Sequence, residues 1–483
     1  MKYTALVLPL AGLASATPLA HAVDSTTESS PLRFRFRAGH LPSQPHARGV
    51  QKKDVVVSNA VPMRKVTNAG GNNALRSVWK QPLHKTFADG WDLTAETNTT
   101  TPAARLRFLI HNQYIVPIQI DDQELQVTVD TGSSDTWVVQ SNFSCFDPDV
   151  GQIGSEFCSF GPVFNGTFKY GSVPDVSSFA LSFSNGEYIG GAAGYDDVTI
   201  AGLTVKKQQI LLANEAMWAG DGVTSGYLGL GYPLGTQVFS SSDPTYAYPG
   251  SPTHRKYDPV FTSMYKQGLV DPVFSIAMNR TSGEGWLAFG GLPPVEHEDD
   301  YARAAIRPIE IDNSPATKTE NTYYTIVPDG FVFGNLNTSN LTFSNPTWTA
   351  DFNDTKPSQF PVILNSGLPF SFLPRSVVLP YVLQFSAPVG RFGGQYWAPC
   401  NSTVPPFGVT LSGGKTIYLA EADILQQEFT QVQSYEGLPV DLCLIAFMDT
   451  LPDGPFYLGD NFLNNFVSVF DVGNSEMRFY PLK

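Results

Sequence analysis

From about residue 105 onward, hydrophobic residues occur in short runs that Gly and Pro interrupt. The runs are rich in β-branched and aromatic residues, as in QYIVPIQI, LQVTV, TWVV, FALSF, DDVTIAGLTV and QQILLA. Such runs are typical of strands, and the 42 Gly and 37 Pro of the chain supply many turns. The pattern predicts a mostly β body, with short helices near 259–268 and 376–385.

The N-terminus reads MKYTALVLPLAGLASATPLAHA, in which one Lys precedes an apolar run and small residues. This order predicts a secretory signal peptide that is cut after Ala16 or Ala22. A buried N-terminal helix is the alternative. No later segment reaches about 18 uninterrupted apolar residues, the length of a membrane span, and the C-terminus lacks the apolar tail of a lipid-anchor signal. We therefore expect a soluble, secreted, extracellular protein.

Charge is distributed unevenly along the chain. Residues 1–100 hold 12 Lys and Arg against 6 Asp and Glu, a net charge of +6. Residues 101–483 hold 18 against 38, a net charge of −20. This asymmetry predicts either a basic head that docks on the acidic body and is later removed, or a solvated basic tail. An acidic body also argues against nucleic acid or an anionic membrane as a partner, because phosphates require a Lys and Arg surface.

Four cysteines allow three disulfide pairings. The local pairing, Cys145 with Cys158 and Cys400 with Cys443, places one bridge in each half of the body, and we expect this arrangement. Metal binding is the alternative, but no Cys-x-x-Cys or His spacing supports it. We therefore expect no metal and no cofactor.

Eight Asn-x-Ser/Thr sequons accompany the signal peptide, so we expect several to be glycosylated. They are Asn98, Asn142, Asn165, Asn279, Asn337, Asn340, Asn353 and Asn401.

The body also contains an internal repeat. VTVDTGSSDTWVV (127–139) and VILNSGLPFSFLP (362–374) share one order of apolar, polar, hydroxyl and Gly positions. The pair Leu228-Gly229 begins 98 residues after Asp130, and Leu458-Gly459 begins 93 residues after Asn365. Two such pairs at matched spacing indicate a duplicated half.

These motifs resemble those of the pepsin family of aspartic proteases. DTGSSDTWVV resembles the family's first active-site loop, and SGYLGLGYP (225–233) and FYLGDNFLNNFVSVFD (456–471) resemble its apolar-Gly strands and C-terminal segment. WLAFGG (286–291) resembles the strand between its lobes. The resemblance covers roughly 105–483. It implies two β-lobes related by a pseudo-twofold axis, with a central cleft that binds a peptide or an unfolded protein segment.

The resemblance also divides the chain. After the signal peptide at 1–22, it implies a basic propeptide-like segment at 23–100, an N-terminal β-lobe at 101–296 and a C-terminal β-lobe at 297–483. AVPMRKV (60–66) resembles the family's propeptide strand. We therefore expect the protein to be a monomer that binds its own basic N-terminal segment. We also expect cuts after Lys53 or Lys65, or near Asn98.

The family's chemistry needs two acids. Each lobe supplies one carboxylate, the two share a single proton, and together they hold the attacking water. In this chain Asp130 is the first catalytic residue, and Trp137 is expected to pack under the substrate flap. The residues that support Asp130 in the first loop are Thr131, Gly132, Ser133 and Ser134.

The second loop departs from the family pattern. Asn365 occupies the position of the second acid, and Ser366 and Gly367 keep the scaffold part of the motif. Leu368 and Pro369 replace the two hydroxyl residues that usually follow. The resemblance therefore implies a degenerate catalytic partner.

The flap departs as well. The resemblance places Phe183 where the family has a tyrosine and keeps Gly186, although a shift in register could give that role to Tyr188.

Two functions compete on these grounds, and a structural β-protein without a ligand is a third possibility. The first is a secreted relative that is catalytically impaired or non-catalytic and binds a peptide or protein. This function follows from the loss of the second acid and of the hydroxyl groups that would support it. General acid–base catalysis raises reaction rates by a factor of about 10²–10⁴. The second is an active aspartic endopeptidase that works at acid pH, in which the Asn365 amide donates a hydrogen bond to the substrate carbonyl.

Overall fold

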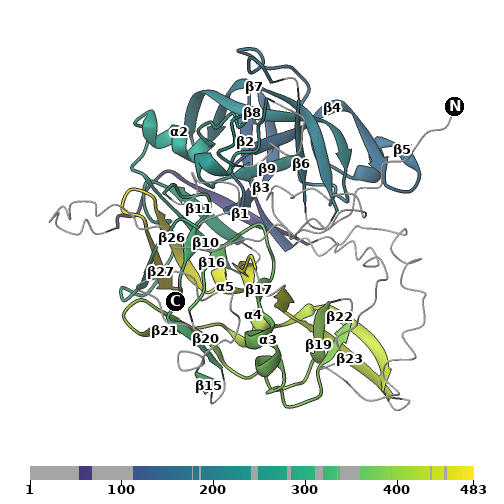
Figure 1. The fold of residues 1–483 in the computed structure, drawn as a ribbon, viewed down its shortest axis with the longest axis vertical. Coiled ribbons are helices and arrows are strands. Elements are labelled where there is room, and N and C mark those ends of the chain that lie inside the picture. Colours follow the sequence, from purple (N-terminus) through teal and green to yellow (C-terminus); the bar gives the residue numbers. More distant parts are fainter. Residues whose placement is uncertain are drawn as a thin grey trace. The chain divides into compact units, whose positions relative to one another are not determined.

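The computed structural model describes most of the body and one short N-terminal segment (Figure 1). The described residues are 54–67, 112–176, 178–183, 186–240, 249–279, 284–309, 319–333, 336–337, 359–392, 394–435, 438–450 and 454–483. The predicted signal peptide (1–22) and the sequons at Asn98, Asn340 and Asn353 lie outside these ranges. Strands make up 49% of the described chain and helices are few, which confirms the predicted fold class.

The body consists of two compact units. The first contains the described parts of 115–269 and 308–323, and the second those of 46–114, 270–307 and 324–483. This division differs from the predicted boundary at residue 296. The strands between 270 and 296 pair with strands of the second unit, as described below.

The described part of the first unit is mainly β-structure and includes the helix α2 (Figure 1). Its elements are β2 (Asn112–Ile120), β3 (Gln123–Asp130), β4 (Thr136–Asp147), β5 (Gly151–Ile153), β6 (Phe179–Ser182), β7 (Tyr188–Ile200), β8 (Leu203–Met217), β9 (Gly226–Gly229), the 3-10 turns η2 (Ser155–Cys158) and η3 (Pro233–Gly235), and α2 (Val260–Lys266). The strand order is β2-β3-β9-β4-β8-β7-β6, and β5 pairs with β4. The central strands are buried on both faces, which explains their long apolar runs.

The second unit contains the remaining strands and helices. They are β1 (Ala60–Thr67), β10 (Val273–Asn279), β11 (Glu284–Phe289), β12 (Ala302–Ala305), β13 (Thr325–Ile326), β14 (Gly330–Phe333), β15 (Leu336–Asn337), β16 (Val362–Leu364), β17 (Ser371–Pro374), α3 (Arg375–Val382), β18 (Gly390–Phe392), β19 (Gln395–Pro399), β20 (Phe407–Leu411), β21 (Lys415–Tyr418), α4 (Glu421–Ile424), β22 (Leu425–Tyr435), β23 (Leu438–Ile445), β24 (Phe447–Thr450), β25 (Tyr457–Leu458), α5 (Asp460–Leu463), β26 (Phe466–Asp471) and β27 (Glu476–Pro481).

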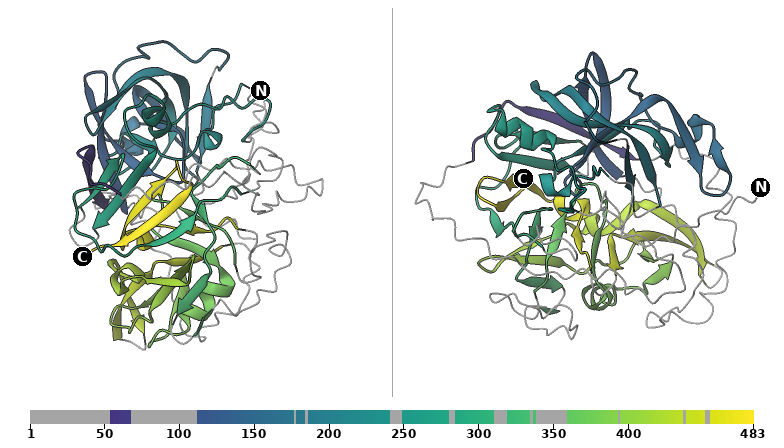
Figure 2. Two further views of the ribbon diagram at one scale, coloured as in Figure 1. Left: turned by 90° about the vertical axis from the view of Figure 1, so that its left-hand side faces the viewer. Right: turned by 45° about the horizontal axis from the view of Figure 1, so that its top comes forward.

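Four strand groups build the second unit. The first has the antiparallel order β12-β27-β26-β10-β11-β1, in which the β26–β27 hairpin is drawn in yellow in Figure 2. The others have the orders β13-β16-β25-β17-β24, β15-β14-β20-β21 and β18-β19-β23-β22. Helices α2 and α3 lie at the two predicted helical positions.

One part of the N-terminal segment is a strand, at the position where AVPMRKV resembles the family's propeptide strand. Residues 60–67 form β1, which pairs antiparallel with β11 over five residue pairs from Ala60–Ala288 to Arg64–Glu284. The strand is completed by backbone pairing with the edge of β11.

The repeated spacing in the sequence corresponds to a repeated strand pairing. β3 runs parallel to β9 with Asp130 opposite Gly229. β16 runs parallel to β25 with Leu364 opposite Leu458. In each half of the sequence, the strand that ends in the apolar-Gly pair therefore lies beside the strand that leads into that half's copy of the repeated loop.

The two disulfides confirm the local pairing. Cys145 bonds to Cys158 in the first unit, and Cys400 bonds to Cys443 in the second. The first bridge ties β4 to η2, and the second links the end of β19 to β23.

Four of the predicted sequons are exposed in the described structure, at Asn142, Asn165, Asn279 and Asn401. Asn337 lies in β15. None of the described helices is long and apolar enough to cross a membrane.

Candidate active site

Asp130 lies at the end of β3 and is fully buried. The backbone N–H of Gly132 donates to Asp130 Oδ1 at 2.8 Å, and the Ser133 hydroxyl donates to Oδ2 at 2.5 Å. Both carboxylate oxygens therefore accept a hydrogen bond from the loop, so the orientation of the acid is fixed.

The first loop is also held from outside. The Ser134 hydroxyl donates to the carbonyl of Tyr232 at 2.7 Å. The backbone N–H of Gly231 donates to the Ser133 carbonyl at 2.7 Å. The segment after β9 thus positions both hydroxyl residues behind Asp130.

Asn365 follows β16 and is also fully buried. The backbone N–H of Gly367 donates to Asn365 Oδ1 at 2.8 Å, which repeats the contact between Gly132 and Asp130. Because an N–H group requires an acceptor, the amide oxygen must face Gly367. The amide nitrogen then takes the place that Oδ2 has on Asp130, where it is a hydrogen-bond donor and cannot take a proton at ordinary pH.

The residues after Gly367 cannot replace the missing chemistry. Leu368 stands three residues after Asn365, as Ser133 stands three residues after Asp130, and its side chain is only 2% exposed. Its carbonyl accepts a hydrogen bond from the Asp460 N–H at 2.7 Å. Leu368 is therefore part of the packing of the second loop, with an apolar side chain where the first loop has a hydroxyl.

Gly229 and Gly459 explain why each apolar strand end finishes in glycine. A Cβ atom on Gly229 would collide with the backbone of Ser134 and Asp135, and one on Gly459 with the carbonyls of Leu368 and Phe370. Only glycine permits this approach to either loop. The second unit keeps this scaffold although its acid is absent.

Thr131 and Ser366, the predicted scaffold hydroxyl residues, are both fully buried in their own units. In the first loop, hydrogen bonds join Gly132 and Ser133 to Asp130. In the second loop, a hydrogen bond joins Gly367 to Asn365.

Trp137 lies at the centre of an aromatic cluster in the first unit. Its ring stacks on Tyr227 at 5.3 Å with an interplanar angle of 11°. It meets Trp218 edge-on at 5.3 Å and lies 6.4 Å from Phe183. Trp137 therefore packs beneath the hairpin formed by β6 and β7, the segment predicted as the flap.

The β6–β7 hairpin positions both predicted flap residues. The backbone N–H of Gly186 donates to the Phe183 carbonyl at 3.0 Å, and Gly186 has a φ of +88°, which favours glycine. The Phe183 side chain is 4% exposed and points into the aromatic cluster. Tyr188, the alternative in another register, pairs with Met217 in the β7–β8 ladder.

Asp135 is a charged neighbour of the first loop to which the sequence analysis gave no role. It is 1% exposed, accepts a hydrogen bond from the Tyr257 hydroxyl at 2.6 Å, and accepts another from the Gln237 N–H at 3.0 Å. Burial raises the pKa of Asp135 to about 6, although both hydrogen bonds oppose this shift. Tyr257 follows Asp135 by 122 residues, so no local signal could reveal the pair.

The raised pKa predicts a specific pH dependence of stability. The folded pKa of about 6 exceeds the value of about 3.9 expected for an unfolded Asp, so between these values the folded protein holds a proton that the unfolded chain has lost. The free energy of unfolding should therefore fall as pH rises through this window, by about 3 kcal/mol from this group. Asp135→Asn should remove most of that decrease and be more stable than the wild type at neutral pH.

Urea unfolding followed by tryptophan fluorescence at several pH values would check this expectation. Asp122→Asn, which changes an exposed carboxyl group in the turn between β2 and β3, is the matched control and should leave the slope unchanged. Parallel pH profiles for Asp135→Asn and the wild type would contradict the assignment.

Within the described residues, no group of three or more His, Cys, Asp or Glu side chains is arranged to hold a metal ion.

Comparisons with known proteins agree with this arrangement. The family model described as eukaryotic aspartyl protease matches residues 113–482. A protein named "Probable aspartic-type endopeptidase" from Aspergillus fumigatus is 32% identical over 374 residues, which cover 76% of this chain and 78% of that protein. Mucorpepsin of Rhizomucor miehei is 27% identical over 394 residues, with coverages of 77% and 78%. Secreted aspartic protease 5 of Candida albicans is 23% identical over 383 residues, with the same coverages.

Proposed function

Because the chain belongs to the eukaryotic aspartyl protease family, we propose that it is a secreted member that binds peptides and has lost most or all peptidase activity. The ligand would be an extended peptide or an unfolded protein segment, the class of substrate that pepsin-like proteases bind in a cleft.

One observation carries this proposal: Asn365 presents an amide nitrogen where Asp130 presents a second carboxylate oxygen. The family's reaction needs one carboxylate to take a proton from water while the other, protonated, polarises the scissile carbonyl. The oxygen of Asn365 already accepts a hydrogen bond from the Gly367 N–H, and its nitrogen neither gives up nor takes up a proton at acid pH. The step in which a protonated acid polarises the scissile carbonyl therefore lacks that acid.

The surroundings of Asn365 support the same conclusion. A serine hydroxyl contacts Asp130 directly, whereas the matching position in the second loop is the buried Leu368. Pro369 then removes a backbone donor as well as a hydroxyl. Loss of several linked groups at one site agrees better with loss of turnover than with a single tolerated substitution.

We expect peptide binding to remain because the first unit keeps the active-site loop around Asp130 and the β6–β7 hairpin. Asp130 has its full set of loop contacts, and Trp137 and Phe183 hold the β6–β7 hairpin against the core. None of these groups depends on an acid at position 365.

The alternative function is an active aspartic endopeptidase that hydrolyses peptide bonds at acid pH. The name of the Aspergillus fumigatus relative favours it. In this alternative the Asn365 amide would donate to the substrate carbonyl, as a protonated acid does.

The test is an assay of the purified protein on a denatured protein substrate at acid pH, beside Asp130→Ala and with an aspartic-protease inhibitor. We expect wild-type turnover no higher than that of Asp130→Ala, together with measurable binding of a labelled peptide. Strong turnover that both Asp130→Ala and the inhibitor abolish would establish the active alternative. The mass of the Asn365 peptide must be measured first, because deamidation would restore an Asp.

A further inference from the structure

We propose that residues 54–67 are a permanent strand of the folded protein, anchored by a carboxylate-binding socket on β27, and not part of a removable N-terminal segment. We define the carboxylate socket as Arg478 and Tyr480. The family match begins at residue 113, so it does not include this segment. The inference does not depend on the proposed function.

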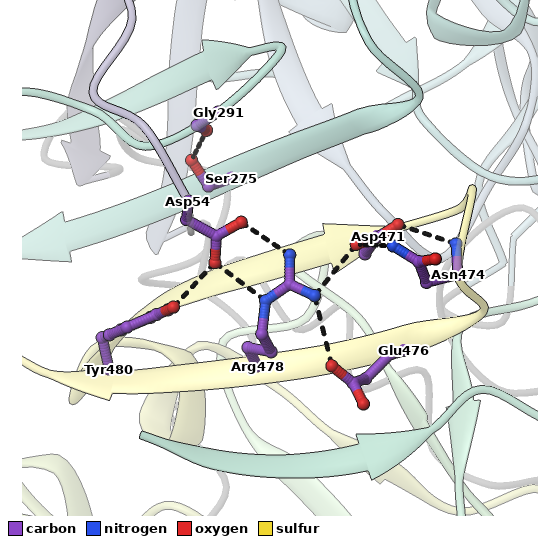
Figure 3. A network of polar contacts seen from close by, with 8 residues as sticks. All are labelled: Asp54, Ser275, Gly291, Asp471, Asn474, Glu476, Arg478 and Tyr480. Carbon is purple, nitrogen blue, oxygen red and sulfur yellow. Dashed lines mark hydrogen bonds and ion pairs between the residues drawn. The ribbon is translucent and has the colours of Figure 1, made fainter. Parts of the chain in front are cut away.

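The carboxylate socket holds Asp54 by three hydrogen bonds (Figure 3). Arg478 Nη2 donates to Asp54 Oδ1 at 2.7 Å, and Arg478 Nε donates to Oδ2 at 2.8 Å. The Tyr480 hydroxyl also donates to Oδ2, at 2.7 Å. This is the bidentate geometry in which a guanidinium recognises a carboxylate most strongly.

Other residues of the β26–β27 hairpin orient Arg478 toward Asp54. Arg478 Nη1 donates to Asp471 Oδ2 at 2.9 Å and to Glu476 Oε1 at 3.2 Å. Asp471 in turn accepts hydrogen bonds from Asn474 at 2.8 Å (Figure 3). The side chains of Arg478 and Asp54 are each about 10% exposed, so water competes little for this contact.

The backbone after Asp54 continues the attachment. The Leu292 N–H donates to the Val55 carbonyl, and the Val57 N–H donates to the Leu292 carbonyl, both at 2.9 Å. β1 then pairs with β11. Along β1 the side chains of Val61, Met63 and Val66 are buried, with exposed fractions of 7%, 2% and 6%. The segment thus contributes to the core of the second unit.

Gly291 shows that the body is shaped around this segment. A Cβ atom at Gly291 would collide with the Val55 carbonyl oxygen and press on the Val57 side chain. The Ser275 hydroxyl fixes the Gly291 carbonyl at 2.6 Å (Figure 3). A larger residue at 291 would exclude the strand.

The attachment constrains where the chain can be cut. A cut after Lys53 keeps every contact, because Asp54 begins the attached segment. A cut after Lys65 would sever β1 within its ladder. A cut between Thr67 and Asn112 would leave a separate fragment that stays bound through the carboxylate socket and β11.

The experiment uses the full chain with a unique protease site inserted between Thr67 and Asn112. After cleavage, native mass spectrometry and gel filtration follow how long the N-terminal fragment stays with the body. We expect the wild-type fragment to stay bound. Asp54→Asn should release it roughly 10- to 100-fold faster, because a charged hydrogen-bonded contact becomes neutral.

Two variants sharpen the test. Arg303→Gln changes a partly exposed arginine of β12 that pairs with Glu476 at 3.7 Å, and it should release the fragment at the wild-type rate. Gly291→Ala should release the fragment faster without altering any charge. Equal release from wild type and Asp54→Asn would overturn the role of the carboxylate socket. A stable folded protein that starts after Thr67 would overturn the permanent strand.

Discussion

Peptidase activity should rise stepwise when the second loop is rebuilt to match the first. Asn365→Asp alone is expected to exceed the wild type, and the triple variant with Leu368→Thr and Pro369→Thr is expected to be the most active. The full gain should be about 10²–10⁴ in kcat/KM, the range that general acid–base catalysis supplies.

Each step of this series has its own physical reason. Asn365→Asp restores the second acid that the family's reaction needs. Leu368→Thr places a hydroxyl three residues after that acid, where Ser133 contacts Asp130 in the first loop. Pro369→Thr returns a backbone N–H and a second hydroxyl. The scaffold already fits an acid, because Gly367 contacts position 365 as Gly132 contacts Asp130.

Initial rates on a denatured protein substrate across acid pH would measure the series. The restored variants should show two ionisations of a coupled pair, and any residual wild-type activity should show one. Leu368→Val is the matched control, since it changes the same buried side chain without adding a hydroxyl. Strong wild-type proteolysis that Asp130→Ala abolishes and Asn365→Asp leaves unchanged would contradict the whole series.

Trp137→Ala should destabilise the first unit by about 3–5 kcal/mol, the usual cost of removing a large aromatic side chain from a core. The Trp137 ring is 1% exposed and contacts Tyr227, Trp218 and Phe183. Its removal leaves a cavity directly beneath the β6–β7 hairpin. The variant should therefore also bind a labelled peptide more weakly at temperatures where it is still folded.

Thermal and urea unfolding of the variant would measure the loss of stability. Trp137→Phe keeps an aromatic ring at the site and should lose clearly less. Tyr418→Ala removes an aromatic side chain that is 54% exposed, and it should unfold close to the wild type. A Trp137→Ala protein as stable as Tyr418→Ala would show that the cluster does not support the hairpin.

The candidate site could be predicted well where its signal is local. Asp130 and its hydroxyl neighbours lie within five consecutive residues, and hydrogen bonds within that stretch fix the acid. The same local order identified Asn365 and the loss of its hydroxyl neighbours. The glycines of both apolar strand ends were visible as a repeat, although only the structure shows which backbone each one approaches.

The sequence by itself determined the strand-rich fold class, because apolar runs and turn residues are local properties. It also determined the two loops and the nearby disulfide between Cys145 and Cys158. Only the tertiary structure decided that Asp54 meets Arg478, 424 residues away, and that the Tyr257 hydroxyl donates to the buried Asp135. These contacts are set by which strand edges meet and which side chains lose water, and neither is encoded in any short stretch of chain. For that reason the charge pattern suggested a basic head on an acidic body, whereas the contact that anchors the segment joins an acid of the head to an arginine of the body.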